Sequence, residues 1–284
     1  MSETATTTSV HLADGDMPAH LWRPPSGSGP GLLLLQEIFG VSTYIRSRAR
    51  DLADLGYVVL APELYWRLGE TVDESRDDVL EQGMALAGRL DWGQTVADSV
   101  AALDALRARP EVTGGVGAVG FCFGGGVAFN VAAEADVDAL VSYYGSALPK
   151  LLDLADRVTV PSLHHFGTAD TYIPLDQVEL IRAAVDGPEV EFPLHDGAGP
   201  AGSGRPRLRQ PGTHVPPPGR GRGRLGAHRG LPGAPAPSGR GCREPLRRRA
   251  CVTRAARASS PVGRGRGSGV FVVRGRVRSR PVAW

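Results

Sequence analysis

Cysteine is scarce in this sequence, and before residue 197 there is only one, Cys122. A single cysteine cannot form an intramolecular disulfide, so a disulfide framework is excluded for this part of the chain. The opening residues, Met-Ser-Glu-Thr-Ala-Thr, lack the basic and apolar regions of a signal peptide. No run reaches the roughly 18 apolar residues that are needed to span a bilayer. We therefore expect a cytoplasmic protein that has no membrane partner.

Lysine and acidic residues are almost missing from the last part of the chain. Residues 1–196 carry 12 Lys and Arg and 29 Asp and Glu, whereas residues 197–284 carry 20 Arg, no Lys and one acid. The net charges of the two parts are therefore −17 and +19, although that of the whole chain is +2. We expect one α/β domain over residues 1–199 and a disordered, basic, Arg/Gly/Pro-rich tail over residues 200–284.

Apolar runs alternate with helix-like segments in the first part. Residues 31–35 form a continuous apolar run, which is typical of a strand buried on both faces of a parallel sheet. The other expected elements are a hairpin (9–12 with 19–22), strands at 57–61, 116–119, 139–144, 160–166 and 189–194, and helices at 43–55, 75–88, 94–108, 127–133 and 175–185. The first of these helices has apolar positions Ile45, Ala49, Leu52 and Leu55. The pattern predicts a doubly wound, mostly parallel sheet that binds ligands at the carboxyl ends of its strands.

The most informative stretch is Gly-Phe-Cys-Phe-Gly-Gly at residues 120–125. It follows an expected strand and precedes an expected helix, which is the context of a nucleophile elbow with Cys122 at its apex. Glycines are needed there because the backbones approach closely. One alternative is a buried structural thiol. Another is a dinucleotide site, since residues 115–120 match G-x-G-x-x-G, but these glycines lie before and within the strand rather than after it.

Two acids follow other expected strands. Glu37 comes after residues 31–35, and Asp170 comes after residues 160–166. Each has an ordinary alternative, because acids after strands are commonly solvated, cap a helix or close a turn. With Cys122, however, Asp170 follows the order nucleophile, acid, histidine of the α/β-hydrolase fold, in which the acid orients an imidazole that deprotonates the nucleophile.

Four motifs, in this order along the chain, make the sequence resemble the dienelactone hydrolases, or carboxymethylenebutenolidases, over residues 10 to about 199. They are Gln-Glu-Ile-Phe-Gly at 36–40, Gly-Phe-Cys-Phe-Gly-Gly at 120–125, Tyr-Tyr-Gly at 143–145 and Gly-Thr-Ala-Asp at 167–170. The resemblance implies an α/β-hydrolase fold and a small ester or lactone as substrate.

The same resemblance implies a role for each candidate residue. Cys122 is the nucleophile, Asp170 orients the catalytic histidine, and Glu37 engages the thiol in the resting enzyme. The backbone N–H groups of Ile38 and Phe123 form the oxyanion hole. The resemblance implies no cofactor and no metal. The chemistry agrees, because a thiol needs an activating partner and a developing oxyanion needs preorganised donors.

The chain departs from this family at the histidine. Family members close the last strand with a Gly-His-aromatic motif, whereas here Asp-Gly-Ala-Gly at 196–199 is followed by Pro200. His195 lies at the end of the last expected strand and in no such motif, so no histidine is assigned to the triad. Among the other histidines, His164, His165, His214 and His228 also belong to no recognised motif. Neighbours in a strand point to opposite faces, so His164 and His165 should not share a metal site.

A slip of the reading frame would explain the departure. Codons can be chosen for residues 206–210 that read as His-Ala-Phe-Asp-Asn in a shifted frame, which matches the missing motif. Twenty Arg without a Lys also fit out-of-frame translation of GC-rich DNA. We expect a slip between about residues 199 and 206, which removes the final helix and places the activity of this chain in doubt.

The tail also has a different interpretation. Residues 220–224 and 264–267 resemble Arg-Gly segments that bind RNA through phosphate contacts and stacking. The alternative function is therefore an inactive α/β-hydrolase-like protein whose tail binds nucleic acid. Nonspecific binding to polyanions is expected in either case.

Overall fold

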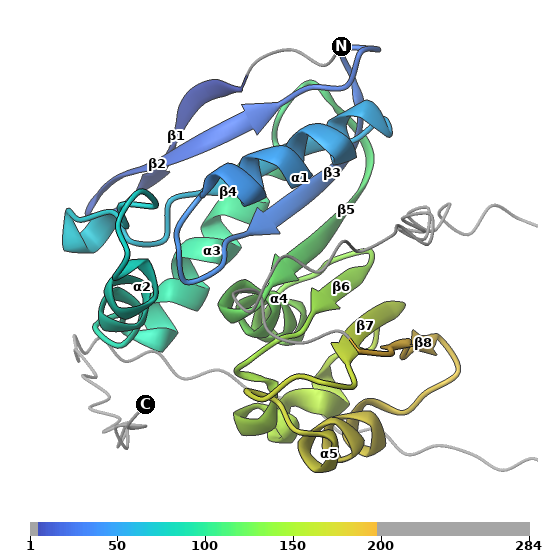
Figure 1. The fold of residues 1–284 in the computed structure, drawn as a ribbon. Coiled ribbons are helices and arrows are strands. Elements are labelled where there is room, and N and C mark those ends of the chain that lie inside the picture. The colour runs from blue at the N-terminus through green and yellow to red at the C-terminus, as the bar shows by residue number, and fades with distance from the viewer. Residues whose placement is uncertain (1–4, 198–284) are drawn as a thin grey trace, which may run out of the picture. The chain divides into compact units, whose positions relative to one another are not determined.

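The computed structural model describes residues 5–197 and shows a β-sheet with helices on both faces (Figure 1). Its strands are β1 (Thr6–Leu12), β2 (Gly15–Trp22), β3 (Gly29–Leu35), β4 (Val58–Pro62), β5 (Val112–Phe121), β6 (Leu140–Tyr143), β7 (Ser162–Gly167), β8 (Val190–Glu191) and β9 (Leu194–His195). Its α-helices are α1 (Thr43–Asp54), α2 (Val79–Ala87), α3 (Trp92–Arg107), α4 (Phe123–Glu134) and α5 (Leu175–Val185). Three short 3₁₀ turns are η1 (Trp66–Leu68), η2 (Leu148–Lys150) and η3 (Leu152–Arg157).

The strand order in this region is β1-β2-β4-β3-β5-β6-β7-β8, and β9 pairs with β7. β2 pairs antiparallel with β1 and β4, whereas the pairs from β4 through β3 and β5 to β9 are parallel. The predicted mostly parallel, doubly wound sheet is confirmed. Because β3, β5 and β7 are parallel, their carboxyl ends lie along one edge, and Glu37, Cys122 and Asp170 follow these three strands there.

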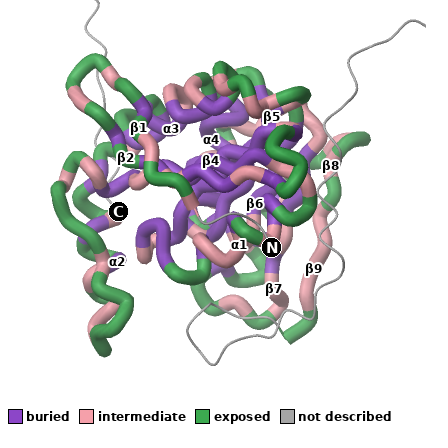
Figure 2. Tube along the Cα trace, turned by 90° about the horizontal axis from the view of Figure 1, so that it is seen from above, coloured by how far each residue is buried: buried purple, intermediate pink, exposed green. Residues whose placement is uncertain are grey.

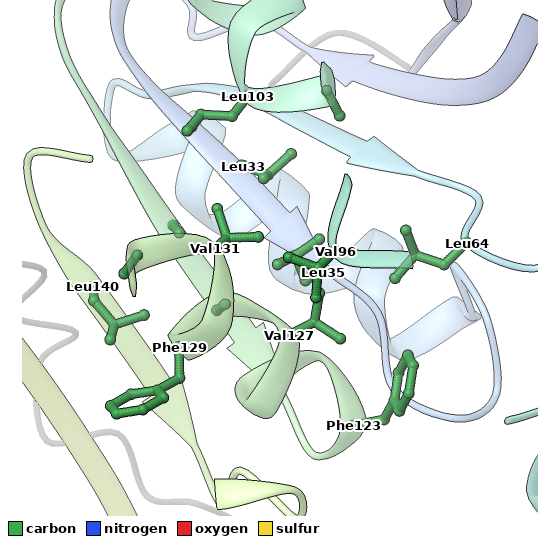
Figure 3. Close-up of a cluster of buried hydrophobic side chains, with 14 of the residues drawn as sticks. Leu33, Leu35, Leu64, Val96, Leu103, Phe123, Val127, Phe129, Val131 and Leu140 are labelled. Atoms are coloured by element: carbon green, nitrogen blue, oxygen red, sulfur yellow. The ribbon is translucent and has the colours of Figure 1, made fainter. Parts of the chain in front are cut away.

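The apolar run of β3 is buried on both faces, as predicted. Leu33 and Leu35 belong to the larger core, formed with α3, α4 and α5, while Leu32 and Leu34 belong to the core under α1. Figure 3 shows part of the larger core, where side chains of α4 pack over β3 and β6. In Figure 2 the buried positions run along the central strands and the exposed ones lie at the rim.

Helix α1 differs from its prediction at one position. Ser42 caps its first turn by accepting a hydrogen bond from the Ile45 N–H at 3.3 Å. Ile45, Ala49 and Leu52 are buried as predicted, but Leu55 is 55% exposed. Leu55 is the C-cap, where the chain leaves the helix, so the helical period no longer directs its side chain to the core.

Other predicted boundaries also change. The opening hairpin is confirmed, but its second strand begins at Gly15 rather than at residue 19, and residues 13–14 form its turn. Helix α2 begins at Val79 rather than at residue 75, because the Asp73 carboxylate holds the Ser75 N–H and hydroxyl in a turn. The strand expected at 189–194 is wrong as a single element: Pro193, which has no N–H to donate, separates β8 from β9.

The remaining predictions about the chain's end lie outside the described residues. These are the loss of the final helix, the tail over residues 200–284 and the frame slip. Within residues 5–197, no helix has the length and hydropathy that crossing a membrane requires.

Candidate active site

The elbow at Cys122 has the geometry that the sequence predicts. Cys122 joins β5 to α4 with φ of 53° and ψ of −116°, a conformation that is unusual for a residue with a Cβ. Its N–H donates to the Tyr143 carbonyl at 3.0 Å, and its carbonyl accepts from the N–H groups of Gly125 at 3.0 Å and Ser146 at 3.1 Å. The bonds to Tyr143 and Ser146 hold the strained turn against the end of β6, and the bond from Gly125 ties it to the first turn of α4.

The glycines around the elbow are required by close backbone contacts. A Cβ on Gly120 would collide with the Gly124 carbonyl, and a Cβ on Gly124 would collide with the carbonyl oxygens of Leu35 and Gln36. The end of β5, the start of α4 and the end of β3 are therefore packed backbone to backbone. This explains the motif sterically and excludes the dinucleotide interpretation of the glycines at 115–120, which lie within β5.

The Cys122 thiol is neutral at neutral pH. Its pKa is raised to about 11, first by burial of the sulfur and then by the negative charge of Glu37. The side-chain hydrogen bond between Cys122 and Ser146 and the backbone hydrogen bond from the Phe123 N–H lower this pKa, and the Asp170 charge raises it. The sulfur lies 3.8 Å from the Ser146 hydroxyl oxygen. The thiol therefore needs a base before it can act as a nucleophile.

Glu37 is a buried carboxylate beside this thiol. It is only 4% exposed, and one of its oxygens accepts a hydrogen bond from the Tyr144 hydroxyl at 3.0 Å. Burial raises the pKa of Glu37 to about 7, the Tyr144 hydrogen bond lowers it, and Glu74 raises it. The structure thus places Glu37 within electrostatic reach of Cys122 while its carboxylate is hydrogen-bonded to Tyr144.

The two expected oxyanion-hole peptides are held in place by their neighbours. The Glu37 carbonyl accepts from the Gly40 N–H at 3.2 Å, and in a planar trans peptide the Ile38 N–H then points the opposite way. The Ile38 carbonyl accepts from the Tyr65 hydroxyl at 2.7 Å. The Phe123 N–H belongs to the first turn of α4 and faces the sulfur of Cys122.

Asp170 follows β7, where it forms backbone hydrogen bonds and also lies close enough to Cys122 to affect the pKa of the thiol. Its Oδ1 accepts from the backbone N–H groups of Tyr172 at 2.8 Å and Ile173 at 3.2 Å, so it closes the turn before α5. Its charge also affects the Cys122 pKa, which places it at the same edge of the sheet. The turn-closing alternative and the site prediction are therefore compatible.

The histidines near the site are engaged elsewhere. His164 is fully buried on the α4 side, where Nε2 lies 3.1 Å from the Ser162 hydroxyl oxygen. His165 points to the other face, stacks on Tyr143 at 4.4 Å, and has its Nδ1 2.9 Å from Nε2 of His195. Burial and then His195 lower the pKa of His165 to about 4. The predicted opposite orientation of His164 and His165 is confirmed.

No metal centre is found within residues 5–197, where three or more His, Cys, Asp or Glu side chains do not gather in a way that could hold an ion. His214 and His228 lie outside the described residues. Sequence reasoning assigned no role to Tyr144, although it noted the Tyr-Tyr-Gly motif, and it missed Tyr65 and Ser146. Nothing in the spacing of Tyr65 or Ser146 marks them as neighbours of the site.

A strand–elbow–helix motif at the carboxyl edge of a mostly parallel sheet is characteristic of the class of α/β-hydrolases. A sequence model of the dienelactone hydrolase family matches residues 17–201. The chain therefore belongs to the dienelactone hydrolase family, whose members are hydrolases of ester and lactone bonds.

Individual relatives agree with this membership. A carboxymethylenebutenolidase of a Pseudomonas species is 36% identical over 174 residues, which are 61% of this chain and 73% of the relative. The carboxymethylenebutenolidase of Pseudomonas putida is 38% identical over 160 residues, 56% of this chain and 68% of the relative. A solved structure from Klebsiella pneumoniae, assigned as a dienelactone hydrolase, superposes with a TM-score of 0.60 at 30% identity and covers 69% of this chain and 87% of its own.

Proposed function

We propose that the chain hydrolyses small esters or lactones through a thioester on Cys122. The observation that carries this proposal is the strained elbow at Cys122, with Glu37 and Asp170 near enough to affect its pKa. The sulfur loses its proton and attacks the carbonyl carbon, and the alkoxide leaving group takes up a proton. Water then attacks the thioester, which releases the carboxylic acid and restores the thiol.

The oxyanion of each tetrahedral intermediate is stabilised by the N–H groups of Ile38 and Phe123. This role is supported by the way both peptides are held, through Gly40 and Tyr65 on one side and the start of α4 on the other. Donors that are already oriented need no reorganisation when the charge develops.

Proton transfer from the thiol needs two further groups. Glu37 engages the thiol, which is supported by its burial and its electrostatic effect on the sulfur. Asp170 orients the imidazole of the catalytic histidine: its two backbone hydrogen bonds use Oδ1 and leave Oδ2 for that ring. The motif that supplies this histidine in the family is absent after residue 199.

The chain as given should therefore be a poor catalyst. By analogy with triad knockouts, we expect a loss on the order of 10⁴ to 10⁶ in kcat. Translating the shifted frame, so that His-Ala-Phe-Asp-Asn follows the last strand, should restore turnover of a chromogenic ester or a dienelactone. Cys122→Ala in the restored chain should abolish this turnover.

Sequencing of codons 196–210 tests the frame slip directly. If the chain as given hydrolyses esters as fast as the restored chain, the frame-slip account of its chemistry is wrong. His195, which lies against His165 in this structure, would then be the first histidine to replace.

The second candidate function, an inactive protein with a tail that binds nucleic acid, rests on charge alone. Residues 197–284 carry 20 Arg and one acid. These residues lie almost entirely outside the described region, and the relatives give no support to nucleic-acid binding. Retention on single-stranded RNA that persists in high salt would favour this candidate, whereas elution at moderate salt indicates nonspecific attraction.

A further inference from the structure

In the described region, two residues other than glycine have positive φ angles, and both lie at this site. They are Cys122, with φ of 53°, and Tyr144, with φ of 39°. Tyr144 follows β6 directly, and its N–H donates to the His165 carbonyl at 2.7 Å. A bulky residue is rarely held in this conformation unless the surrounding structure requires it. The proposed role of Cys122 as the nucleophile accounts for the strain at Cys122. Tyr144 has no role in the proposed reaction as described above.

The strained backbone brings the Tyr144 hydroxyl to Glu37. The hydroxyl donates to Oε1 of Glu37 at 3.0 Å, across 107 residues of sequence. Because Glu37 is 4% exposed, its negative charge cannot be stabilised by bulk water and depends on local partners.

The groups that face Glu37 come from four separate segments of the chain. They are Tyr144 after β6, Cys122 at the elbow, Tyr44 on α1 and Glu74 in the segment before α2. None of the four carries a positive charge, and Glu74 repels the carboxylate and raises its pKa. The Tyr144 hydroxyl is the partner that favours the charged form of Glu37.

We propose that Tyr144 is a positioning residue: its hydroxyl holds the Glu37 carboxylate charged and oriented beside Cys122, and so sets the pH range in which the charged Glu37 engages the thiol. A deprotonated carboxylate only accepts hydrogen bonds, whereas the protonated form carries a donor of its own. The inference rests on the proposed function in one respect, the engagement of the thiol by Glu37.

The direct test is the titration of Glu37 in the full chain. Carbon-13 NMR of labelled glutamate carboxyl carbons follows it, with the signal assigned by its loss in Glu37→Gln. In Tyr144→Phe we expect the pKa of Glu37 to rise by about one unit, because a hydrogen bond to a charged group contributes on this scale. The matched control is Tyr57→Phe. Tyr57 is partly buried and precedes β4, at the other end of the strands from the site.

A second measurement reads the same effect at the sulfur. The rate of Cys122 alkylation by iodoacetamide, measured by peptide mass spectrometry, follows the thiolate fraction and rises with pH. Ionisation of Glu37 raises the thiol pKa, so the rise should flatten near the pKa of Glu37. Tyr144→Phe should move this flat region upward by about one pH unit, and Glu37→Gln should remove it whether residue 144 is Tyr or Phe.

These outcomes separate the two proposals. An unmoved Glu37 titration in Tyr144→Phe, or an equal shift in Tyr57→Phe, overturns the role of Tyr144. A shifted titration in a protein whose ester turnover does not depend on Cys122 supports the role of Tyr144 and overturns the nucleophile. A purely structural role would lower the thermal transition of Tyr144→Phe and leave the Glu37 titration in place.

Discussion

Cys122 and Glu37 each carry a free-energy cost in the folded chain, Cys122 through backbone strain and Glu37 through burial of its carboxylate. The positive φ of 53° at Cys122 costs on the order of 1–3 kcal/mol for a residue with a Cβ. Glu37 loses hydration when it is buried, and only part of that loss is offset by its hydrogen bond to Tyr144. Unfavourable residues that meet at one edge of a sheet are typical of a functional site rather than of a structural one.

The free-energy cost of burying the charged Glu37 carboxylate should make the stability of the folded chain depend on pH. Its pKa is about 7 in the folded chain against 4.5 ordinarily, so between these values the unfolded chain releases a proton that the folded chain keeps. Stability therefore falls as the pH rises from about 4.5 to about 7, and little cost remains below this window. We expect Glu37→Gln to increase the free energy of unfolding at pH 8 by on the order of 1–3 kcal/mol and to have a much smaller effect at pH 5.

Urea unfolding at the two pH values measures this difference. Glu189→Gln is the matched control, because Glu189 is exposed. The prediction fails if Glu37→Gln changes stability equally at both pH values.

At the scale of elements, helix α2 supports the loop that carries Ile38. It buries Gly83 and Leu86 and leaves Leu80 and Met84 exposed. A Cβ on Gly83 would lie 2.9 Å from the Ile38 carbonyl oxygen, the same atom that accepts from Tyr65. The loop that carries the Ile38 N–H is therefore held between α2 and the residue before η1.

Replacing Gly83 should break this contact. An alanine in a helix is normally more stable than glycine by roughly 0.5–1 kcal/mol. Gly83→Ala should instead destabilise the chain, because its Cβ meets a backbone oxygen that cannot turn away, and α2 has to shift. In the frame-restored chain it should also lower kcat through the displaced Ile38 peptide.

The matched control is Gly93→Ala in the first turn of α3. There the nearest atom to the new Cβ is an Asp91 carboxylate oxygen at 3.5 Å, an ordinary contact. We expect a higher thermal transition for Gly93→Ala and a lower one for Gly83→Ala. If both variants are stabilised alike, α2 does not press on the loop.

At the scale of the whole molecule, the sequence predicts that the basic tail contributes charge and little burial. A chain ending at residue 204 should keep nearly the same thermal transition, because a segment without helical or strand period buries little apolar surface. It should also lose retention on a polyanion column, since all 20 Arg after residue 197 are then removed. A large drop in the thermal transition would show that the tail packs on the domain.

Local patterns were sufficient for most of the fold. The apolar run of β3 and the period of α5 (Leu175–Val185) predicted their elements, because burial on two faces and on one face leave different repeats. The failures lie where short-range hydrogen bonds or chain exit override the repeat. Asp73 delays α2, Leu55 ends α1, and Pro193 divides the last strand.

For the site, the sequence by itself determined the elbow at Cys122 and the strand ends that carry Glu37 and Asp170. These features follow from backbone sterics and from the parallel order of the strands. Both leave patterns in short stretches of the sequence. Only the tertiary structure decided that Tyr144 holds Glu37, that Tyr65 holds Ile38 and that His165 meets His195. Such contacts join residues far apart in sequence, and they depend on strand register and on backbone strain that no local pattern records.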